Sequence, residues 1–224
     1  MVRTHHFPRG QGLLEGTLAI GIILIGLGGL LALTLRNVTA TTASAQRIVA
    51  LQLAREGLEV VRGIRDSNWL AGSGGGSQTW DQGLTPPCTP VCGVAVSLVP
   101  PDSQTPITWQ LQPPPAGSVI SRTDFSQAPL QMFRSSTDHL WRQDANVSLG
   151  NAYLPTGFYR LVILEPLCQS VGGVTTVATN QSDCGTDTKI GYRVEAAVAW
   201  PTPGLFGGAY RSSLSLVEYI YNWR

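Results

Sequence analysis

Lysine and histidine are scarce in this sequence. Lysine occurs once, at Lys189, and the three histidines are His5, His6 and His139. Charged residues make up 13% of the chain, about half the share of an average soluble domain. The 15 basic residues are balanced by 14 acidic ones and are scattered, so the sequence offers no basic patch for nucleic acid. The shortage of histidine argues against hydrolase and metal chemistry.

Motifs of common enzymes are also absent. The run Gly72–Gly76 lacks the Lys-Ser/Thr of a phosphate loop, and no G-x-S-x-G nucleophile elbow occurs. Asn180, Asp183 and Asp187 lie close together but lack the spacing of an EF-hand, which favours a solvated loop. We therefore expect a chain that is not an enzyme and that binds no cofactor and no metal.

Cysteine is missing from the first 87 residues, and the four that follow are Cys88, Cys92, Cys168 and Cys184. An even number beyond an apolar segment favours disulfides formed in an oxidising compartment. Free thiols and a zinc site are the alternatives, although these spacings do not make two close zinc knuckles. Three connectivities are possible, and we favour the local pairs Cys88–Cys92 and Cys168–Cys184.

Proline is absent between Pro8 and Pro86, and charge is absent from Gly16–Leu35. A helix over these 20 uncharged residues would reach about 30 Å, the thickness of a hydrocarbon core. The preceding leader contains Arg3 and Arg9 and no acid, so it is expected to stay in the cytoplasm. This predicts a single-pass membrane protein whose C-terminal part lies outside the cytoplasm.

The helix is expected to continue beyond the apolar segment. Residues 36–69 are rich in Ala, Leu, Arg, Glu and Gln, and the pattern fades before Gly72–Gly76. We predict one helix from about Gln11 to about Trp69, with residues 11–35 in the membrane and residues 36–69 amphipathic. Its apolar stripe should pack on a sheet and consists of Ala50, Leu53, Ala54, Gly57, Val60, Val61 and Ile64.

The remainder of the chain predicts β-structure. Residues 70–130 are rich in Gly and Pro and are expected to form a long loop, with short strands possible at 94–99 and 107–111. Residues 131–224 contain stronger strand patterns, above all at 157–164, 190–200 and 209–223. The expected fold class is α+β, with the long N-terminal helix packed on a C-terminal antiparallel sheet of three or four strands.

The N-terminal residues resemble those of type IV prepilins. A basic leader, residues 1–10, ends in Gly10, and the mature chain would begin at Gln11 with Glu15 as its fifth residue, inside an apolar helix. The resemblance implies a pilin-like lollipop fold and cleavage after Gly10 by the prepilin peptidase, which then methylates the amine of Gln11. Whether Gln11 is methylated or cyclised to a lactam is left open. The further partners implied are neighbouring pilin subunits, an inner-membrane assembly platform and the lipid bilayer.

Glu15 is the candidate assembly residue. A carboxylate at membrane depth costs roughly 2.5–3.5 kcal/mol. The freed amine of a neighbouring subunit about 4 Å away would attract it by about 4 kcal/mol at an effective dielectric of about 20, before desolvation is subtracted. The alternative is an interfacial glutamate that snorkels or is protonated.

These residues together predict a structural role. The first hypothesis is a type IV pilin-like subunit assembled from the inner membrane into an extracellular pilus. The departures at Gln11 and at Ala32, where many pilins have proline, favour a minor subunit. The alternatives are a pseudopilin of a type II secretion or DNA-uptake machine and a signal-anchored extracytoplasmic binding module. Six tryptophans leave an adhesive role open.

Overall fold

A computed structural model gives the fold of the chain. The structure describes residues 11–85, 93–99, 108–113, 122, 130–137, 139–143, 153–179, 181–203 and 209–223. The chain forms two compact units that divide between Gln46 and Arg47. The first unit contains the N-terminal part of the one helix found among the described residues. The second contains the rest of that helix and the sheet.

The helix α1 spans Gln11–Ser73, four residues further than the sequence pattern predicted. Without proline, no residue in this stretch removes a backbone donor, so the i to i−4 hydrogen bonds continue. The helix ends at the glycine run. There Gly74 N donates to Leu70 O, and Gly75 adopts a left-handed conformation with φ of 89°, which is typical of a helix C-terminus.

The β-structure is antiparallel and forms one eight-stranded sheet within the described residues, which confirms the α+β fold class. The strands are β1 (Gly93–Val99), β2 (Thr108–Gln112), β3 (Gln131–Ser135), β4 (Trp141–Gln143), β5 (Tyr153–Gln169), β6 (Thr175–Val177), β7 (Thr188–Pro203) and β8 (Ala209–Tyr221).

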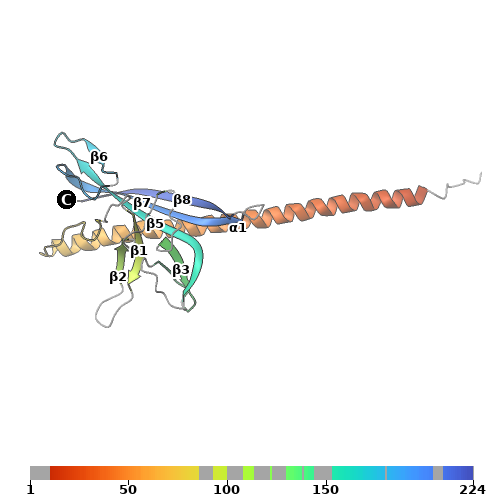
Figure 1. The fold of residues 1–224 in the computed structure, drawn as a ribbon, viewed down its shortest axis with the longest axis horizontal. Coiled ribbons are helices and arrows are strands. Elements are labelled where there is room, and N and C mark those ends of the chain that lie inside the picture. Colours follow the sequence, from red (N-terminus) through yellow and green to blue (C-terminus); the bar gives the residue numbers. More distant parts are fainter. Residues whose placement is uncertain are drawn as a thin grey trace, which may run out of the picture. The chain divides into compact units, whose positions relative to one another are not determined.

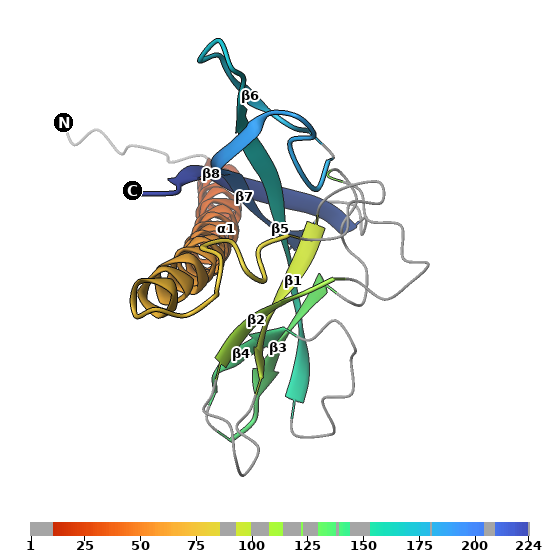
Figure 2. The ribbon, with the colours of Figure 1, turned by 90° about the vertical axis from the view of Figure 1, so that its left-hand side faces the viewer.

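Strand β5 organises this sheet. It pairs with β7 along most of its length, with β3 near its start, with β1 at Val162 and Ile163, and with β6 near its end. Strand β8 then pairs with β7 through thirteen successive residues. Figure 2 shows the consequence: β6 and the β1–β4 group lie at opposite ends of β5.

The predicted apolar stripe of α1 packs on this sheet. Ala50, Leu53, Ala54, Val60 and Val61 are buried, and Ile64 is partly buried against the same cluster. Figure 1 shows β5, β7 and β8 running along this part of the helix. Because strand side chains alternate, one set of sheet residues faces the same cluster, namely Val162, Leu164, Val194, Ala196, Val198 and Ile220.

The opposite face of the sheet has a second, smaller core. Leu161, Ile163, Ala197 and Ala199 are buried there with Leu130 and Ala95. Their positions alternate with those of the helix-facing residues on β5 and β7. Both faces of the central strands are therefore buried, which explains why these strands lack a clean apolar–polar alternation in the sequence.

The sequence underestimated the sheet. Three or four strands were expected, and the described residues form eight. Strands β1 and β2 lie inside the region expected to be a long loop, close to the two short strands considered possible there. Strand β5 extends well beyond the predicted residues 157–164 and includes Pro155 and Pro166, although proline is uncommon inside strands.

Close approach of the helix and the sheet depends on Gly57. A Cβ atom at this position would lie 3.1 Å from Val162 Cγ2, 3.5 Å from Ala196 Cβ and 3.6 Å from Arg160 Cδ. Glycine thus lets the helix backbone come close to β5 and β7. This explains why a glycine belongs to a stripe of otherwise apolar residues.

Candidate functional site

The N-terminal part of α1 carries the site residues that the sequence predicted. Gln11 is the first residue of the helix. Gly10 and the rest of the leader lie outside the described residues, as does the side chain of Gln11. The structure therefore describes the helix that follows the predicted cleavage point and not the residues that precede it.

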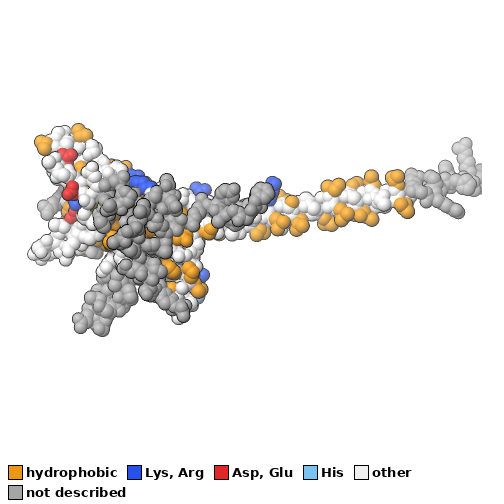
Figure 3. Space-filling view, in the orientation of Figure 1, with side chains coloured by type: hydrophobic (Ala, Val, Ile, Leu, Met, Phe, Trp, Pro, Cys, Tyr) orange, Lys and Arg blue, Asp and Glu red, His pale blue; other side chains and the backbone are white. Residues whose placement is uncertain are grey.

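The surface of this helical segment is apolar and exposed. Its large aliphatic side chains are each at least 57% exposed. Figure 3 shows hydrophobic side chains along both visible edges of the segment. By length and composition the helix is able to cross a membrane. The exposed aliphatic residues are Leu13, Leu14, Leu18, Ile20, Ile22, Ile23, Leu24, Ile25, Leu27, Leu30, Leu31, Leu33 and Leu35.

Glu15 lies on this apolar surface in the second turn of α1. Its side chain is exposed, and within the described residues it makes no hydrogen bond or ion pair. Neighbours one turn away on a helix lie three and four residues apart, and for Glu15 these are Leu18 and Ala19 on one side and Gln11 and Gly12 on the other. Among the described side chains, none compensates this carboxylate.

Glycines leave parts of this helical segment without side chains. A Cβ atom added at Gly16, Gly21, Gly26, Gly28 or Gly29 would meet nothing within 4 Å in the described residues. These glycines therefore make no close packing with the described part of the chain, although each costs up to about 1 kcal/mol of helix propensity relative to alanine. Small residues allow helices in a bilayer to approach closely, so the segment is suited to packing against other helices.

Threonine side chains in the following turns return to the backbone. Thr34, Thr39, Thr41 and Thr42 each donate to the carbonyl oxygen four residues earlier, at distances of 2.8–2.9 Å. These bonds satisfy the hydroxyl groups within the helix itself. The hydroxyl donors of these threonines are therefore satisfied without water.

One of the two predicted disulfides lies in the described residues. Cys168, near the end of β5, is bonded to Cys184 in the loop before β7, with their Cα atoms 5.5 Å apart. The bond ties the end of β5 to the loop before β7. Cys88 and Cys92 lie outside the described residues, so the other predicted pair stays a prediction.

A buried charge network on the sheet was not foreseen. The Glu165 side chain is 2% exposed and accepts hydrogen bonds from Arg193, at 2.6 Å, and from Arg122. Glu195 accepts from the same two arginines at 3.0 and 3.1 Å. The network arises because the β5–β7 register places Glu165 opposite Arg193. No local sequence signal reveals such a pairing between residues 28 apart.

A second unforeseen group is Arg160, which is 1% exposed on the helix-facing side of β5. Its Nε donates to Gln143 Oε1 at 3.0 Å, its Nη1 donates to Leu53 O at 3.2 Å, and the same Nη1 lies 3.4 Å from Glu56 Oε2. Burial lowers the pKa of this guanidinium, and Glu56 opposes that effect. Arg160 thus connects α1, β4 and β5 and has a structural role.

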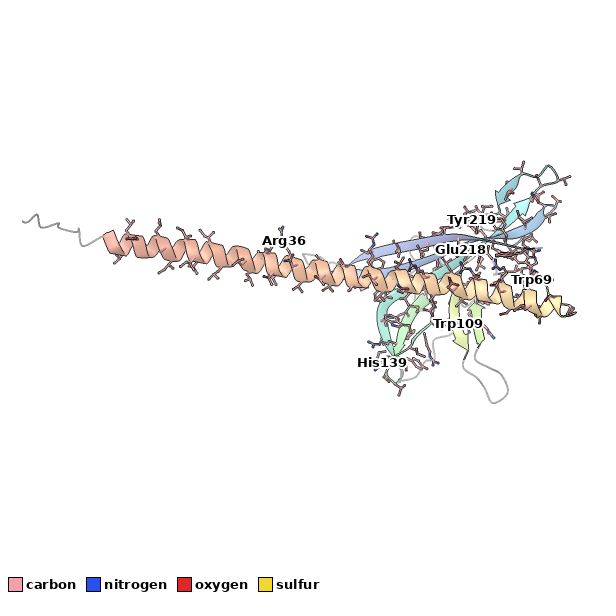
Figure 4. All side chains as sticks on the ribbon, turned by 180° about the vertical axis from the view of Figure 1, so that it is seen from behind. Arg36, Trp69, Trp109, His139, Glu218 and Tyr219 are labelled. Carbon is pink, nitrogen blue, oxygen red and sulfur yellow. A yellow bond between two sulfur atoms is a disulfide. The ribbon has the colours of Figure 1, made fainter. Side chains whose placement is uncertain are left out.

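Aromatic and arginine side chains meet where the end of α1 approaches the end of β8. Trp69 Nε1 donates to Trp223 O at 2.9 Å, and the Arg65 guanidinium lies 5.2 Å from the centre of the Trp223 ring. A hollow of about 330 Å³ is lined by these three residues with Asp66, Leu70 and Asn222. Figure 4 shows Trp69 near the end of α1, and Glu218 and Tyr219 on the nearby strand.

A larger hollow of about 620 Å³ continues along β8 and shares Arg65, Asp66 and Trp223 with the first. On this side Arg62 lies 2.6 Å from Glu59 and 2.5 Å from Glu218. The hydrogen bond to Glu218 raises the pKa of the Arg62 guanidinium. We call the two hollows together the α1–β8 groove. It contains charges that are already paired within the chain.

Polar groups considered at the sequence level do not gather. His139 is exposed at the turn between β3 and β4, and Asp183 Oδ1 accepts from Gly185 N in the loop before β7. Figure 4 shows His139 at the far end of its hairpin, away from Trp69 and Glu218. Within the described part of the chain, no three His, Cys, Asp or Glu side chains come together as metal ligands.

Comparison of the chain with known protein families, with curated proteins and with solved structures finds no match. The resemblance noted in the sequence therefore depends on the N-terminal motif. The long helix with its apolar N-terminal half and the antiparallel sheet packed on its C-terminal half are compatible with a pilin-like chain.

Proposed function

We propose that the chain is a type IV pilin-like structural subunit, processed after Gly10 and assembled from the inner membrane into an extracellular filament. The observation that supports this most directly is the surface of α1 between Leu13 and Leu35. It is apolar on all sides and contains one carboxylate, Glu15, at the fifth position from the proposed cleavage point. The sheet packed on the rest of α1, which we call the head, would be displayed on the surface of the filament.

The assembly step follows from the chemistry of this surface. In the membrane, lipid covers the aliphatic side chains, and Glu15 is the residue that this environment tolerates least. A neighbouring subunit that offers a liberated amine stabilises Glu15 and sets the stagger between the two helices. The glycines of both helices then allow close contact. The chain itself performs no covalent chemistry, and the cleavage belongs to a peptidase.

Mass spectrometry of the mature N-terminus tests the cleavage. The proposal expects a chain that begins at Gln11, with a methylated or cyclised terminus. A methylated amine keeps its positive charge and supports the pairing with Glu15, whereas a lactam removes it. An intact Met1, or a start well beyond Gln11, would overturn the proposal that the chain is a processed pilin.

The Glu15→Gln variant tests the role of the carboxylate. It removes the charge and keeps the size of the side chain, so insertion into the membrane should be retained. The yield of sheared filaments should fall by at least about tenfold, because up to about 4 kcal/mol of attraction is lost before desolvation is counted. Glu59→Gln is the matched control, since Glu59 lies on the same helix and is 63% exposed. Equal filament yields from both variants would make the helix a simple anchor.

A further inference from the structure

Aromatic side chains are exposed on the head where the end of α1 approaches the end of β8. Trp69 is 45% exposed and Trp223 is 67% exposed, and both line the hollow of about 330 Å³ in the α1–β8 groove. Tyr219 and Tyr221 line the part of the groove that follows β8 and are also exposed. Such rings offer a large, flat apolar surface, and here that surface is open to solvent.

A polar hollow lies next to the aromatic one. Its volume is about 390 Å³, and it shares Trp69 and Asn222 with the α1–β8 groove. Hydroxyl and amide side chains from the end of α1 and the segment after it contribute to its lining, among them Ser73, Gln78 and Thr79. Trp69 therefore lies between a largely apolar recess and a polar one, and both have the size of small-molecule sites.

Two hydrogen-bond acceptors at these hollows lack a donor within the described residues. Asn222 Oδ1 is buried and has no partner there, which is unfavourable for an amide carbonyl. The Asp66 side chain is 54% exposed; its Oδ1 accepts from Arg65 Nε at 2.8 Å, whereas its Oδ2 has no partner in the described chain. A ligand that fits here is therefore expected to donate hydrogen bonds, as hydroxyl groups do.

The charges at the groove disfavour both anions and cations. The Arg65 side chain is 7% exposed and pairs with Asp66, so the accessible charge is the carboxylate, which repels phosphate and sulfate groups. Arg62, farther along β8, is neutralised by two glutamates. The Arg65 guanidinium already lies over the Trp223 ring, 5.2 Å from its centre, so a second cation there would be repelled. A neutral ligand is favoured.

We propose that the α1–β8 groove and the polar hollow beside it bind a neutral glycan, whose sugar rings pack on Trp69 and Trp223. Its hydroxyl groups donate to Asp66 Oδ2 and to Asn222 Oδ1. Asn222 lines both hollows, so rotation of its amide brings that oxygen within reach of a bound hydroxyl. A sugar ring has an apolar face of C–H groups and a rim of neutral hydroxyl donors, and it therefore matches both the aromatic rings and the acceptors.

Other ligands with flat rings match the groove less well. A proline-rich peptide offers apolar rings, but its backbone presents carbonyl acceptors in place of donors. A single-stranded nucleic acid offers bases that stack, but its phosphates would meet the exposed carboxylate. The proposal goes beyond the proposed function, since it concerns a ligand of the head and depends neither on cleavage nor on assembly.

Binding is measured on the unprocessed full chain in phosphatidylcholine nanodiscs, by the change in tryptophan fluorescence as a neutral hexasaccharide is added. The probes are cellohexaose, chitohexaose and maltohexaose, which are uncharged and differ in linkage or in substituents. The expected result is that at least one of them binds with a dissociation constant below about 1 mM. Empty nanodiscs provide the blank.

Trp223→Ala removes one of the two rings and should weaken this binding at least about tenfold, as the loss of an aromatic stacking partner does elsewhere. Trp223→Phe keeps a ring and should restore the affinity to within about threefold of the unmodified chain. Trp109→Ala is the matched control and should leave binding unchanged, because Trp109 is 37% exposed on β2 and lines neither hollow. Figure 4 shows Trp109 and Tyr219 on opposite sides of α1.

Asn222→Ala tests the buried acceptor. The substitution removes the amide side chain and keeps the backbone N–H that donates to Ile190 O at 2.8 Å. Affinity for the hexasaccharide should fall about fivefold, because one hydrogen bond to the ligand is lost. The thermal unfolding temperature should not fall, since Oδ1 has no partner to lose within the described residues. A lower unfolding temperature with unchanged affinity would contradict the assignment of Asn222 to the ligand.

Failure of all three hexasaccharides to bind, or an equal effect of Trp223→Ala and Trp109→Ala on their affinity, would overturn the proposal. Tighter binding of a decaproline peptide or of a single-stranded thymidine oligonucleotide, lost in Trp223→Ala, would also overturn it and would assign the groove to that class of ligand. Glu15→Gln separates the proposal from the proposed function, because glycan binding should persist in that variant while the yield of filaments falls.

Discussion

Lys189, the single lysine of the chain, shows how one residue holds a connection in place. Its ammonium pairs with Asp81, in the segment between α1 and β1, and hydrogen-bonds to Tyr192 Oη at 3.1 Å. Trp80, the neighbour of Asp81, packs on the Tyr192 ring with their centres 5.7 Å apart. The segment that follows α1 is thereby attached to the start of β7.

The pKa values of this pair are shifted in opposite directions. Burial raises the pKa of Asp81, but the hydrogen bonds from Lys189 and Thr79 and the positive charge of Lys189 together outweigh it, so this pKa lies below its ordinary value of 3.8. Burial lowers the pKa of Lys189, but Asp81 and Tyr192 outweigh it, so this pKa lies above 10.5. The stabilisation is therefore complete between these two ordinary values. It is lost as the pH falls through the lowered pKa or rises through the raised one.

We predict that Asp81→Asn lowers the free energy of unfolding at neutral pH by about 1 kcal/mol, as expected for a partly exposed pair. The difference from the unmodified chain should vanish above the raised pKa of Lys189, where the ammonium is neutral in both proteins. Urea unfolding followed by tryptophan fluorescence at pH 7 and at a strongly alkaline pH measures both quantities. Asp183→Asn, in an exposed loop, is the control and should show no difference at either pH.

At the scale of elements, the packing of α1 on β5 and β7 determines the head. The buried residues of the helix face both strands through the stripe that contains Gly57. Gly63 lies on the same helix, but a Cβ atom there would meet nothing within 4 Å. Packing on the sheet therefore requires glycine at position 57, whereas a substitution at Gly63 should change the helix propensity alone.

We predict opposite effects for the same substitution at these two positions. Gly57→Leu should destabilise the head by about 1–3 kcal/mol, because the larger side chain pushes α1 away from Val162 and Ala196. Gly63→Leu should be neutral or stabilising by up to about 1 kcal/mol, since leucine favours the helix more than glycine does. Thermal unfolding of the full chain in detergent, followed by circular dichroism, measures both. A similar loss of stability at both positions would contradict this account of the packing.

Over the whole molecule, the two units differ in what covers their apolar side chains. In residues 47–224 the helix stripe and the sheet bury one another. In the first unit the aliphatic side chains of α1 are exposed. Such a surface is stable in a bilayer or against similar helices and is unfavourable in water. The chain therefore depends on an apolar environment for one unit only.

We predict that one charge within the apolar segment weakens membrane retention. Ile23→Arg places a guanidinium near the middle of residues 16–35, at a cost of about 2.5–3.5 kcal/mol. The fraction of chain that stays in the membrane pellet after alkaline carbonate extraction should fall. Ile48→Arg is the control, because Ile48 is 60% exposed but lies outside this segment. Equal retention of both variants would show that residues 16–35 do not hold the chain in the membrane.

Much of the helix was determined by the sequence itself. The apolar run, the missing proline and the repeat of small and aliphatic residues are local signals, and they predicted the extent of α1 to within four residues and most of its buried stripe. The Cys168–Cys184 bond was likewise expected from short spacing. Glu15, Gln11 and Gly10 were identified from a local motif, and the proposed function depends on them.

Only the tertiary structure decided the extent and register of the sheet and the surfaces that it presents. The length of β5, the network around Glu165 and the buried position of Arg160 all follow from strand register between residues that are far apart in the chain. A shift of one residue in that register would move every side chain to the other face. Local patterns cannot specify such a pairing, because its energy comes from contacts that exist only once the strands have met.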